Sequence, residues 1–371
     1  MKIVFVSNYF NHHQRPLSDA LYAITEGNYH FIETAPMRAE RRQLGYGWDN
    51  MPGYVLSAYK SETEKRESLK LIMEADAVIA GSAPEEYLRD RIRGGKLVLR
   101  YCERPLKNGL EPLKYLPRLL RWHLWNPGGK PIYLLAASAY AGMDYAKFGL
   151  FRNKTYRWGY FPERQHYEQL PEKEKNTLLW VGRFLDWKHP DDAILAAARL
   201  RDEGYAFQLR FIGTGVMEQQ LQQMVFDLGL EDFVCFLGPM KPEQVRSCME
   251  RASILLFTSD RREGWGAVVN EAMNSGCTVI ASDAAGCVPY LIRHGVNGSV
   301  YRCGNTAQMA AELKNLLDHP ETGKARGEAA YETITGLWNA EIAAARLVEL
   351  IQGLLGCGPM PRFADGPCSA E

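Results

Sequence analysis

Short apolar runs alternate with helix-length segments along most of the chain, and this rhythm restricts the fold more than any other feature. Apolar runs of this length between polar turns are typical of strands buried in parallel sheets. The expected strands are residues 2–6, 29–33, 77–80, 96–101 and 132–136, then 178–181, 208–212, 233–237, 253–257 and 278–281. The expected helices are 17–25, 63–74, 84–93, 190–201, 216–228, 242–251, 266–275 and 306–317. The alternation predicts an α/β fold with helical crossovers.

The length of the chain predicts two such domains. At 371 residues it exceeds the usual size of one hydrophobic core. A polar stretch at 161–176 that contains Pro162 and Pro171 separates the halves and is the expected linker. We expect Rossmann-like domains at 1–160 and 177–335 with their sheets facing across a cleft, where ligands bind in such folds. A helix at 336–353 is expected to pack back on the first domain, and a disordered tail is expected at 354–371.

Charge and cysteine content restrict the partners and the compartment. Lys+Arg and Asp+Glu both number 44, and this zero net charge argues against a nucleic-acid partner held by bulk electrostatics. The eight cysteines form no Cys-x-x-Cys pair, and several lie in apolar runs, which favours buried free thiols in a reducing compartment. The N-terminal apolar run is too short for a signal peptide, and no run approaches the length of a membrane span. We expect a cytoplasmic protein.

Glu263 and Glu271 bracket a stretch that leads into an expected helix. Along a helix this spacing corresponds to about 12 Å, roughly the distance between the sugar and the ribose of a nucleotide diphosphate-sugar. Gly264 and Gly266 would let backbone N–H groups approach the diphosphate between these two ends, where the helix dipole favours negative charge. The pair therefore predicts a polar ligand that lies across a helix N-terminus.

Basic residues and glycines follow other strands of the second half. Arg183, after Gly182, and Lys188 place two cations at the expected carboxyl edge of the sheet, where they suit a phosphate group; two ordinary solvated residues are the alternative. Gly213-Thr-Gly215 and Gly238 follow the next two strands. A tight strand-to-helix turn is the favoured explanation of Gly213-Thr-Gly215, whereas Gly238 could equally form such a turn or present backbone groups to a base edge.

Taken together, residues 177–318 resemble the donor domain of retaining glycosyltransferases of family 4, which have the GT-B architecture. The resemblance rests on Gly182-Arg183 with Lys188, on Glu263-Gly-Trp-Gly with Glu271, and on the later Gly295-Val-Asn-Gly298. It is similar in particular to the enzymes that synthesise bacterial polysaccharides.

The resemblance implies a role for each of these residues. Arg183 and Lys188 would neutralise the donor diphosphate, and Glu271 would accept hydrogen bonds from the ribose hydroxyls. Glu263 would lie by the donor sugar and is the expected catalytic residue. The backbone of Gly264, Trp265 and Gly266 would contact phosphate or sugar. The family transfers sugars with retention and without a catalytic metal, and the chain has no Asp-x-Asp metal motif. No cofactor is expected besides the donor itself, with a UDP-sugar first and GDP-mannose second.

The first half departs from the family pattern. Asn11 and His12 follow the first strand, where many members carry two glycines, and they offer hydrogen bonds to a sugar acceptor. Glu103 stands where a histidine is common; it could take a proton from the acceptor or form a structural pair with Arg104. A further departure is Tyr290, where glutamate is common. The general base is therefore left open.

The segment 112–125 interleaves apolar and aromatic residues with cations. It lies within residues 96–130, which contain eight Lys/Arg and two Glu, a net charge of +6. Such a helix suits an anionic membrane surface, at the inner face of the cytoplasmic membrane, and a lipid-linked saccharide as acceptor. A helix packed on its own domain with its cations in solvent is the alternative.

Three functions fit the sequence. The first is a retaining, metal-independent glycosyltransferase acting on a saccharide or lipid-linked saccharide. The second is a GT-B nucleotide-sugar epimerase, which binds the same donor without an acceptor. The third is a non-catalytic GT-B subunit that binds a partner enzyme. The complete set of charged residues (Arg183, Lys188, Glu263 and Glu271) favours an enzyme, and their spacing favours the transferase.

Overall fold

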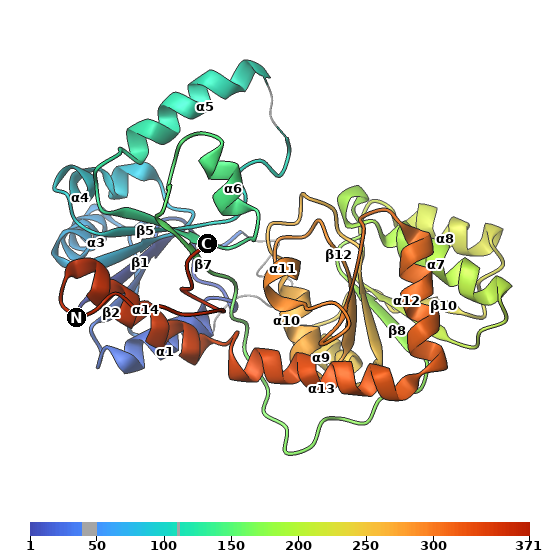
Figure 1. The fold of residues 1–371 in the computed structure, drawn as a ribbon. Helices are drawn as coiled ribbons and strands as arrows, with labels where there is room; N and C mark the ends of the chain where they lie inside the picture. Colours follow the sequence, from blue (N-terminus) through green and yellow to red (C-terminus); the bar gives the residue numbers. More distant parts are fainter. Residues whose placement is uncertain (39–49, 110–111) are drawn as a thin grey trace. The chain divides into compact units, whose positions relative to one another are not determined.

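The computed structural model describes residues 1–38, 50–109 and 112–371, and it describes side chains of the helix at 112–125 from residue 116 on. The chain forms two compact units (Figure 1). Unit 1 comprises Met1–Glu163 together with Trp338–Glu371, and unit 2 comprises Arg164–Leu337. Unit 1 is therefore built from two separate stretches of the chain, whereas unit 2 is continuous.

Unit 1 contains a seven-stranded parallel sheet in the order β3-β2-β1-β4-β5-β6-β7. Every residue of the inner strand β1 is buried, because helices cover both faces of a parallel sheet. The strands are β1 (Ile3–Ser7), β2 (Tyr29–Glu33), β3 (Val55–Ser57), β4 (Ala77–Ala80), β5 (Val98–Cys102), β6 (Ile132–Ala136) and β7 (Thr155–Arg157).

The helices of unit 1 connect these strands. Ser61 begins α3 by accepting a hydrogen bond from the Glu64 N–H, and Glu62 and Glu64 lie in the first turn, where the helix dipole favours them. The helices are α1 (Arg15–Ile24), α3 (Glu62–Glu74), the short η2 (Glu85–Tyr87), α4 (Arg89–Arg93), α5 (Pro112–Trp125), α6 (Ala141–Ala146) and α14 (Ala340–Leu355). The C-terminal helix α14 packs on α1.

Unit 2 contains a six-stranded parallel sheet in the order β10-β9-β8-β11-β12-β13. Its strands are β8 (Thr177–Val181), β9 (Gln208–Ile212), β10 (Val234–Phe236), β11 (Ile254–Phe257), β12 (Thr278–Ser282) and β13 (Ser299–Tyr301). Its helices are η3 (Asp186–Lys188), α7 (Pro190–Asp202), α8 (Glu218–Asp227), α9 (Pro242–Arg251), α10 (Ala267–Asn274), α11 (Val288–Leu291), α12 (Thr306–Asp318) and α13 (Pro320–Gly336). A core of aromatic and aliphatic side chains, including Trp180, Phe184 and Phe211, fills the space between sheet and helices.

The predicted α/β class with two parallel sheets is confirmed, and each of the ten predicted strands is present with its ends within two residues. The sequence did not predict β3, β7 and β13, which have three residues each. All three are outer strands of their sheets. An outer strand pairs on one side only, so it needs no long apolar run that would mark it in the sequence.

The C-terminal segment leaves unit 2 and joins unit 1. Helix α14 occupies most of the stretch where a helix was expected, and α13 before it was not predicted. Asp365, which lies in the segment 354–371 where disorder was expected, forms an ion pair with Arg157 of β7 at 2.8 Å. The Cys368 side chain is buried, and Ala370 forms an antiparallel bridge with Tyr156. These contacts extend β7 with a short piece of the chain end.

Two further observations concern thiols and membranes. The eight cysteines are free thiols, of which Cys248, Cys277, Cys287 and Cys368 are buried. Among the helices in the described ranges, none combines the length and apolar character that crossing a membrane requires.

Candidate functional site

The loop between β11 and α10 carries the glutamate–glycine motif, and glycine is required at its end. Gly266 precedes the first residue of α10 with φ of 104°, a conformation that side chains disfavour. A Cβ atom there would lie 3.1 Å from Phe257 Cε1, closer still to Cζ of the same ring, and 3.4 Å from the Cys287 sulfur. The backbone therefore approaches the sheet closely at the point where the helix begins.

We expect Gly266→Ala to destabilise unit 2 by about 2–4 kcal/mol, because it combines a disfavoured φ with a clash against buried groups. Gly295→Ala is the matched control, since Gly295 also has a positive φ, 79°, but nothing within 4 Å of its Cβ position. That control should cost about 1 kcal/mol. Urea unfolding of both variants measures the difference, and equal losses would contradict the role given to close packing.

The Trp265 side chain belongs to the core, so only the backbone of this residue is open to the predicted ligand contact. The indole is fully buried, and its Nε1 donates a hydrogen bond to Asn270 Oδ1 at 2.9 Å. Its ring lies 6.2 Å from that of Tyr290, the residue that departs from the family pattern. Glu263 and the two glycines precede the helix, so the helical spacing expected between Glu263 and Glu271 applies only to the part of the stretch from Ala267 on.

Lys188 and Glu263 form a close ion pair. Lys188 Nζ lies 2.6 Å from Glu263 Oε2, and both side chains are largely shielded from solvent, with exposed fractions of 14% and 13%. Ser259 Oγ donates a second hydrogen bond to the same carboxylate oxygen at 3.1 Å. The Lys188 carbonyl accepts a bond from Thr258 Oγ1, which anchors this segment to the end of β11. The structure thus brings into direct contact the residue predicted to bind the diphosphate, Lys188, and the residue predicted to lie by the sugar, Glu263.

The position of this pair in the sheet is the one at which open parallel sheets bind ligands. Lys188 follows β8 and Glu263 follows β11, which are neighbours in the sheet. The order of strands reverses between them, because the chain runs from β8 outward to β10 and then returns to β11. The crevice at the carboxyl ends of the strands flanking such a reversal is the usual binding site of this architecture.

Three glycine turns lie side by side at the same edge. The Gly182 N–H donates to the Ile212 carbonyl and the Gly213 N–H donates to the Gly238 carbonyl, both at 3.0 Å. Gly213 has a φ of 136°, and a Cβ atom there would collide with the Gly182 carbonyl. The predicted residue Gly238 is thereby held beside the turns that follow β8 and β9. Tight packing accounts for Gly213, whereas the space around the Gly238 Cβ position is open.

Arg183 differs from Lys188 in having its charge available. Its side chain is exposed, and no acidic side chain in the described parts of the chain forms an ion pair with it. An exposed guanidinium at the carboxyl edge of β8 offers two parallel N–H donors to an anion. Of the two predicted phosphate ligands, Arg183 is thus the one not yet engaged by a carboxylate.

Glu271 lies in the second turn of α10 and is half-buried. Burial raises the pKa of its carboxyl from 4.5 to about 6, and the charge of Arg246 partly opposes this effect. Arg246 extends from α9, and its guanidinium donates to the Glu271 carbonyl at 3.2 Å and to Asn274 Oδ1 at 3.0 Å. Carboxyl groups whose pKa is raised by burial occur frequently at binding sites.

Sequence reasoning did not identify Arg246 or the charged residues around Lys188. Arg262 forms ion pairs with Asp260 at 3.1 Å and with Asp186 at 2.9 Å, and His189 lies 3.5 Å from the same Asp260 carboxylate. Asp186 and His189 follow β8, whereas Asp260 and Arg262 follow β11, so the contacts between the two loops form only because these strands are neighbours. The distance between the loops along the chain gives no spacing from which these contacts could be inferred.

One group of side chains in the described residues has the geometry for a cation. Ligand atoms of His189, Asp191 and Asp192 lie within 4.8 Å of one another. Both aspartates are in the first turn of α7, where the helix dipole favours negative charge, and this accounts for them without a metal.

The predicted acceptor residues lie in unit 1 and are linked through two residues that were not predicted. The loop after β1 holds His12 and His13 with their rings 3.7 Å apart, and the His13 ring lies 6.2 Å from that of Tyr160. Tyr160 donates its hydroxyl to Glu103 Oε1 at 2.7 Å, so Glu103 and His12 belong to one group of polar side chains. Glu103 also forms an ion pair with Lys107 at 3.1 Å.

The alternative structural pairing of Glu103 with Arg104 does not form. Arg104 instead binds the buried carboxylate of Asp144 at 3.2 Å. Asn11 has a local role in shaping the turn, because its Oδ1 accepts a hydrogen bond from the His13 N–H at 2.9 Å. Its side chain is therefore committed to the loop that presents the histidines.

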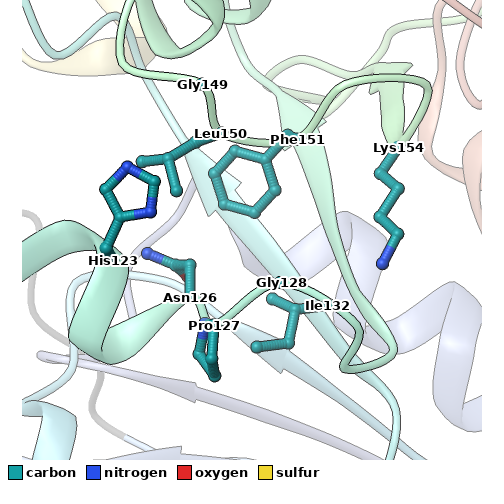
Figure 2. Close-up of a pocket in the computed structure, with 9 residues that line it drawn as sticks. All are labelled: His123, Asn126, Pro127, Gly128, Ile132, Gly149, Leu150, Phe151 and Lys154. Atoms are coloured by element: carbon teal, nitrogen blue, oxygen red, sulfur yellow. The ribbon is translucent and has the colours of Figure 1, made fainter.

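A pocket of about 110 Å³ in unit 1 lies apart from these residues (Figure 2). It is formed by the C-terminal end of α5 and the loop before β7, with His123 and Lys154 among the residues around it. None of the predicted acceptor residues lines it. Its volume is below the roughly 300–1,000 Å³ usual for small-molecule sites.

Comparison with known protein families identifies a match for the second half of the chain. A family model described as "Glycosyl transferases group 1" matches residues 162–333. The N-acetyl-alpha-D-glucosaminyl L-malate synthase of Bacillus anthracis is 30% identical over 172 residues, which cover 46% of this chain and 44% of that protein. The amylovoran biosynthesis glycosyltransferase AmsK of Erwinia amylovora is 30% identical over 182 residues, covering 48% and 44%. The match thus spans just under half the length of these curated relatives.

Comparison of structures covers nearly the whole chain. The crystal structure of Anabaena Alr3699/HepE in complex with UDP is similar with a TM-score of 0.70 over 95% of this chain and 100% of that one. The two sequences are 17% identical, so this likeness concerns the fold. Both units therefore follow one known architecture.

Proposed function

We propose, from the match of residues 162–333 to the glycosyl transferases group 1 family and from the GT-B fold, that this chain is a retaining glycosyltransferase of family 4. It moves a sugar from a nucleotide diphosphate-sugar to a saccharide or lipid-linked saccharide. The observation that carries the proposal is the pair of Lys188 and Glu263 at the reversal of strand order, beside the glycine that begins α10. A reacting donor needs a cation at its diphosphate, where negative charge grows, and a carboxylate at its sugar, to accept hydrogen bonds from the hydroxyls.

The arrangement supports a division of labour along the donor. The diphosphate binds the exposed Arg183 and the N–H groups at the start of α10, which a helix leaves without internal acceptors. The ribose hydroxyls donate to the Glu271 carboxylate. Lys188 turns from Glu263 toward the arriving diphosphate, and the released Glu263 carboxylate then accepts hydrogen bonds from the sugar. The ion pair between Lys188 and Glu263 thus breaks, and each residue forms a contact with a different end of the donor.

In the transfer step, the bond between the anomeric carbon and the diphosphate oxygen breaks, and its electron pair leaves with the nucleoside diphosphate. The acceptor oxygen forms the new bond on the same face of the sugar and gives up its proton to the departing diphosphate oxygen on that face. Arg183 and Lys188 stabilise the negative charge that grows on the leaving oxygen, which is the main demand of the reaction. Metal independence is part of the proposal: two cations and the helix dipole supply this charge stabilisation.

The acceptor is proposed to approach the polar group of unit 1. Glu103 and His12 are the candidates for hydrogen bonds to its hydroxyls, with Tyr160 and His13 between them. UDP-sugars are the first choice of donor, supported by the UDP in the Anabaena structure. GDP-mannose is the second.

Release of the nucleoside diphosphate tests the function against its alternatives. A transferase releases UDP or GDP from the nucleotide sugar in proportion to added acceptor, and the product keeps the anomeric configuration of the donor. An epimerase changes the sugar and releases no free nucleotide as product. A non-catalytic subunit binds a partner and turns over no donor in a screen of nucleotide sugars.

We expect Arg183→Ala to weaken UDP binding about tenfold, because a charge-assisted contact to phosphate contributes roughly 1.5 kcal/mol. The thermal midpoint should not change, since Arg183 is exposed and pairs with no described acidic side chain. Arg199→Ala is the matched control, because Arg199 is also exposed but lies in the last turn of α7, away from the carboxyl edge. Calorimetry with UDP and GDP measures both; equal affinities in the two variants would remove Arg183 from the site.

A further inference from the structure

Helix α5 presents leucines to solvent on its outer face. Leu116, Leu120 and Leu124 recur every fourth residue, so they form one stripe along the helix. Their exposed fractions are 60%, 62% and 70%. An exposed helix face of a globular protein is normally polar, and a continuous apolar stripe marks a surface that contacts something else.

The opposite face of the same helix is already used for packing. Leu119 and Trp122 pack against the hydrophobic cluster around Leu134 and Tyr145. The Trp122 ring lies 4.8 Å from that of Phe148, and His123 forms a hydrogen bond with the Phe148 carbonyl at 2.8 Å. The helix is thereby fixed to unit 1 by one side, with its leucine stripe outward. Figure 1 shows α5 at the periphery of this unit.

Cations accompany the leucine stripe, and acids do not. Residues 112–125 contain Lys114, Arg118 and Arg121 and no Asp or Glu. Arg121 is exposed, and Arg118 lies over the Trp122 ring at 5.8 Å. The surrounding segment 96–130 carries the net charge of +6, although the Lys114 and Glu111 side chains lie outside those that the structure describes.

We propose that α5 docks unit 1 on an anionic lipid surface, with the leucine stripe inserted at the level of the headgroups and the exposed Arg121 next to it. An apolar face flanked by basic side chains is the combination that holds a helix in the plane of such a surface. At 14 residues the helix is too short to cross the hydrocarbon core.

The charge pattern favours a membrane over a second copy of the chain. Two α5 helices face to face would bring like charges together without any acid from the helix to neutralise them. An anionic bilayer offers both a hydrocarbon region for the leucines and phosphates for the arginines. The proposed docking does not depend on the proposed glycosyl transfer. Only the further statement, that a lipid-linked acceptor binds at this surface, rests on that function.

Co-sedimentation with phospholipid vesicles tests the proposal. The wild-type protein should partition onto vesicles of mixed phosphatidylcholine and phosphatidylglycerol more strongly than onto phosphatidylcholine alone. The triple variant Leu116→Gln, Leu120→Gln, Leu124→Gln should lose at least about tenfold in partitioning, because it removes the inserted apolar area.

The contribution of charge is tested separately. Arg121→Glu should lose about tenfold in partitioning on the anionic vesicles only. Arg118→Glu with Arg121→Glu should lose more, with a thermal melt to check that the stacking of Arg118 on Trp122 is not needed for folding.

Val216→Gln with Phe226→Gln is the matched control, since these unit 2 side chains are 87% and 67% exposed. It should leave partitioning unchanged. Unchanged partitioning of the leucine variant would overturn the proposal, as would a lower molecular mass of that variant in sedimentation, which would show that a second copy covers the stripe. UDP affinity, measured on the same samples, should equal that of wild type. Vesicle binding without any nucleotide binding would leave docking intact and contradict the proposed function.

Discussion

Replacing Glu271 with glutamine should make the unliganded protein more stable at neutral pH while weakening its binding of UDP. Burial raises the pKa of the Glu271 carboxyl from 4.5 to about 6, so the native protein holds this proton more tightly than the unfolded chain does. Between these two pH values the free energy of unfolding therefore falls as pH rises. At about 1.4 kcal/mol per pH unit, the ionised carboxylate costs up to about 2 kcal/mol at pH 7. Glutamine has no charge to desolvate and removes that cost.

The opposite sign is expected for ligand binding. Ribose hydroxyls donate to the Glu271 carboxylate in the proposed complex, and glutamine can accept only through one neutral oxygen. We expect the affinity for UDP to fall by about 10–100-fold, the value of one or two hydrogen bonds to a charged group. In the wild type, affinity should also fall as pH drops through about 6, because protonation removes the acceptor.

Two measurements separate these effects. Urea unfolding at pH 7.5 and pH 5 should show the gain of Glu271→Gln at the higher pH and much less of it at the lower. Calorimetry over the same range should show a steeper loss of UDP affinity in the wild type than in Glu271→Gln, and this comparison cancels the titration of UDP itself. Glu231→Gln, at an exposed carboxylate of unit 2, is the control for a change of charge alone. A destabilised Glu271→Gln with unchanged UDP affinity would give Glu271 a purely structural role.

Glu263→Ala should reduce turnover by about 100–1000-fold with UDP affinity equal to or tighter than that of the wild type, since a group aimed at developing charge acts mainly in the transition state. The expected sign for binding comes from the ion pair with Lys188 at 2.6 Å. In the wild type the diphosphate must compete with Glu263 for the Lys188 ammonium group. Without the carboxylate, the ammonium group is available at once.

Lys188→Met is the companion variant, and it should lose both UDP affinity and turnover. Steady-state kinetics with a nucleotide sugar and calorimetry with UDP together distinguish the two residues. Weaker UDP binding in Glu263→Ala, comparable with that of Lys188→Met, would mean that the pair acts as one structural unit. Full turnover in Glu263→Ala would remove this residue from the reaction.

Local sequence patterns predicted the longer strands and most helices of both units but not the contacts between the loops that follow them. The ten predicted strands were visible because each is an apolar run buried between helices. Residues such as Glu263 and Glu271 could be selected because glycines and a helix start surround them. The pairing of Lys188 with Glu263 was not predictable in the same way, because the two are 75 residues apart and meet only through the adjacency of β8 and β11.

The same limit explains what was missed around the predicted residues. Arg246 reaches Glu271 from α9, and no motif connects them in the sequence. In unit 1, Tyr160 reaches Glu103 from a segment that the sequence analysis placed at the domain boundary. Residue types and spacings report the chemistry of one loop, whereas the contacts between loops depend on the order of strands in the sheet.

The division of unit 1 into two stretches of chain has a consequence for synthesis on the ribosome. Unit 2 is complete once Leu337 has been made, and it can fold as one continuous piece. Unit 1 begins first and finishes last, because α14 must arrive before its buried residues Leu347, Leu350 and Ile351 can cover α1. Until then, the face of α1 that contacts α14 remains without that cover. The nascent chain therefore carries a finished unit 2, proposed to bind the nucleotide, while unit 1, proposed to meet the acceptor, is still an open intermediate.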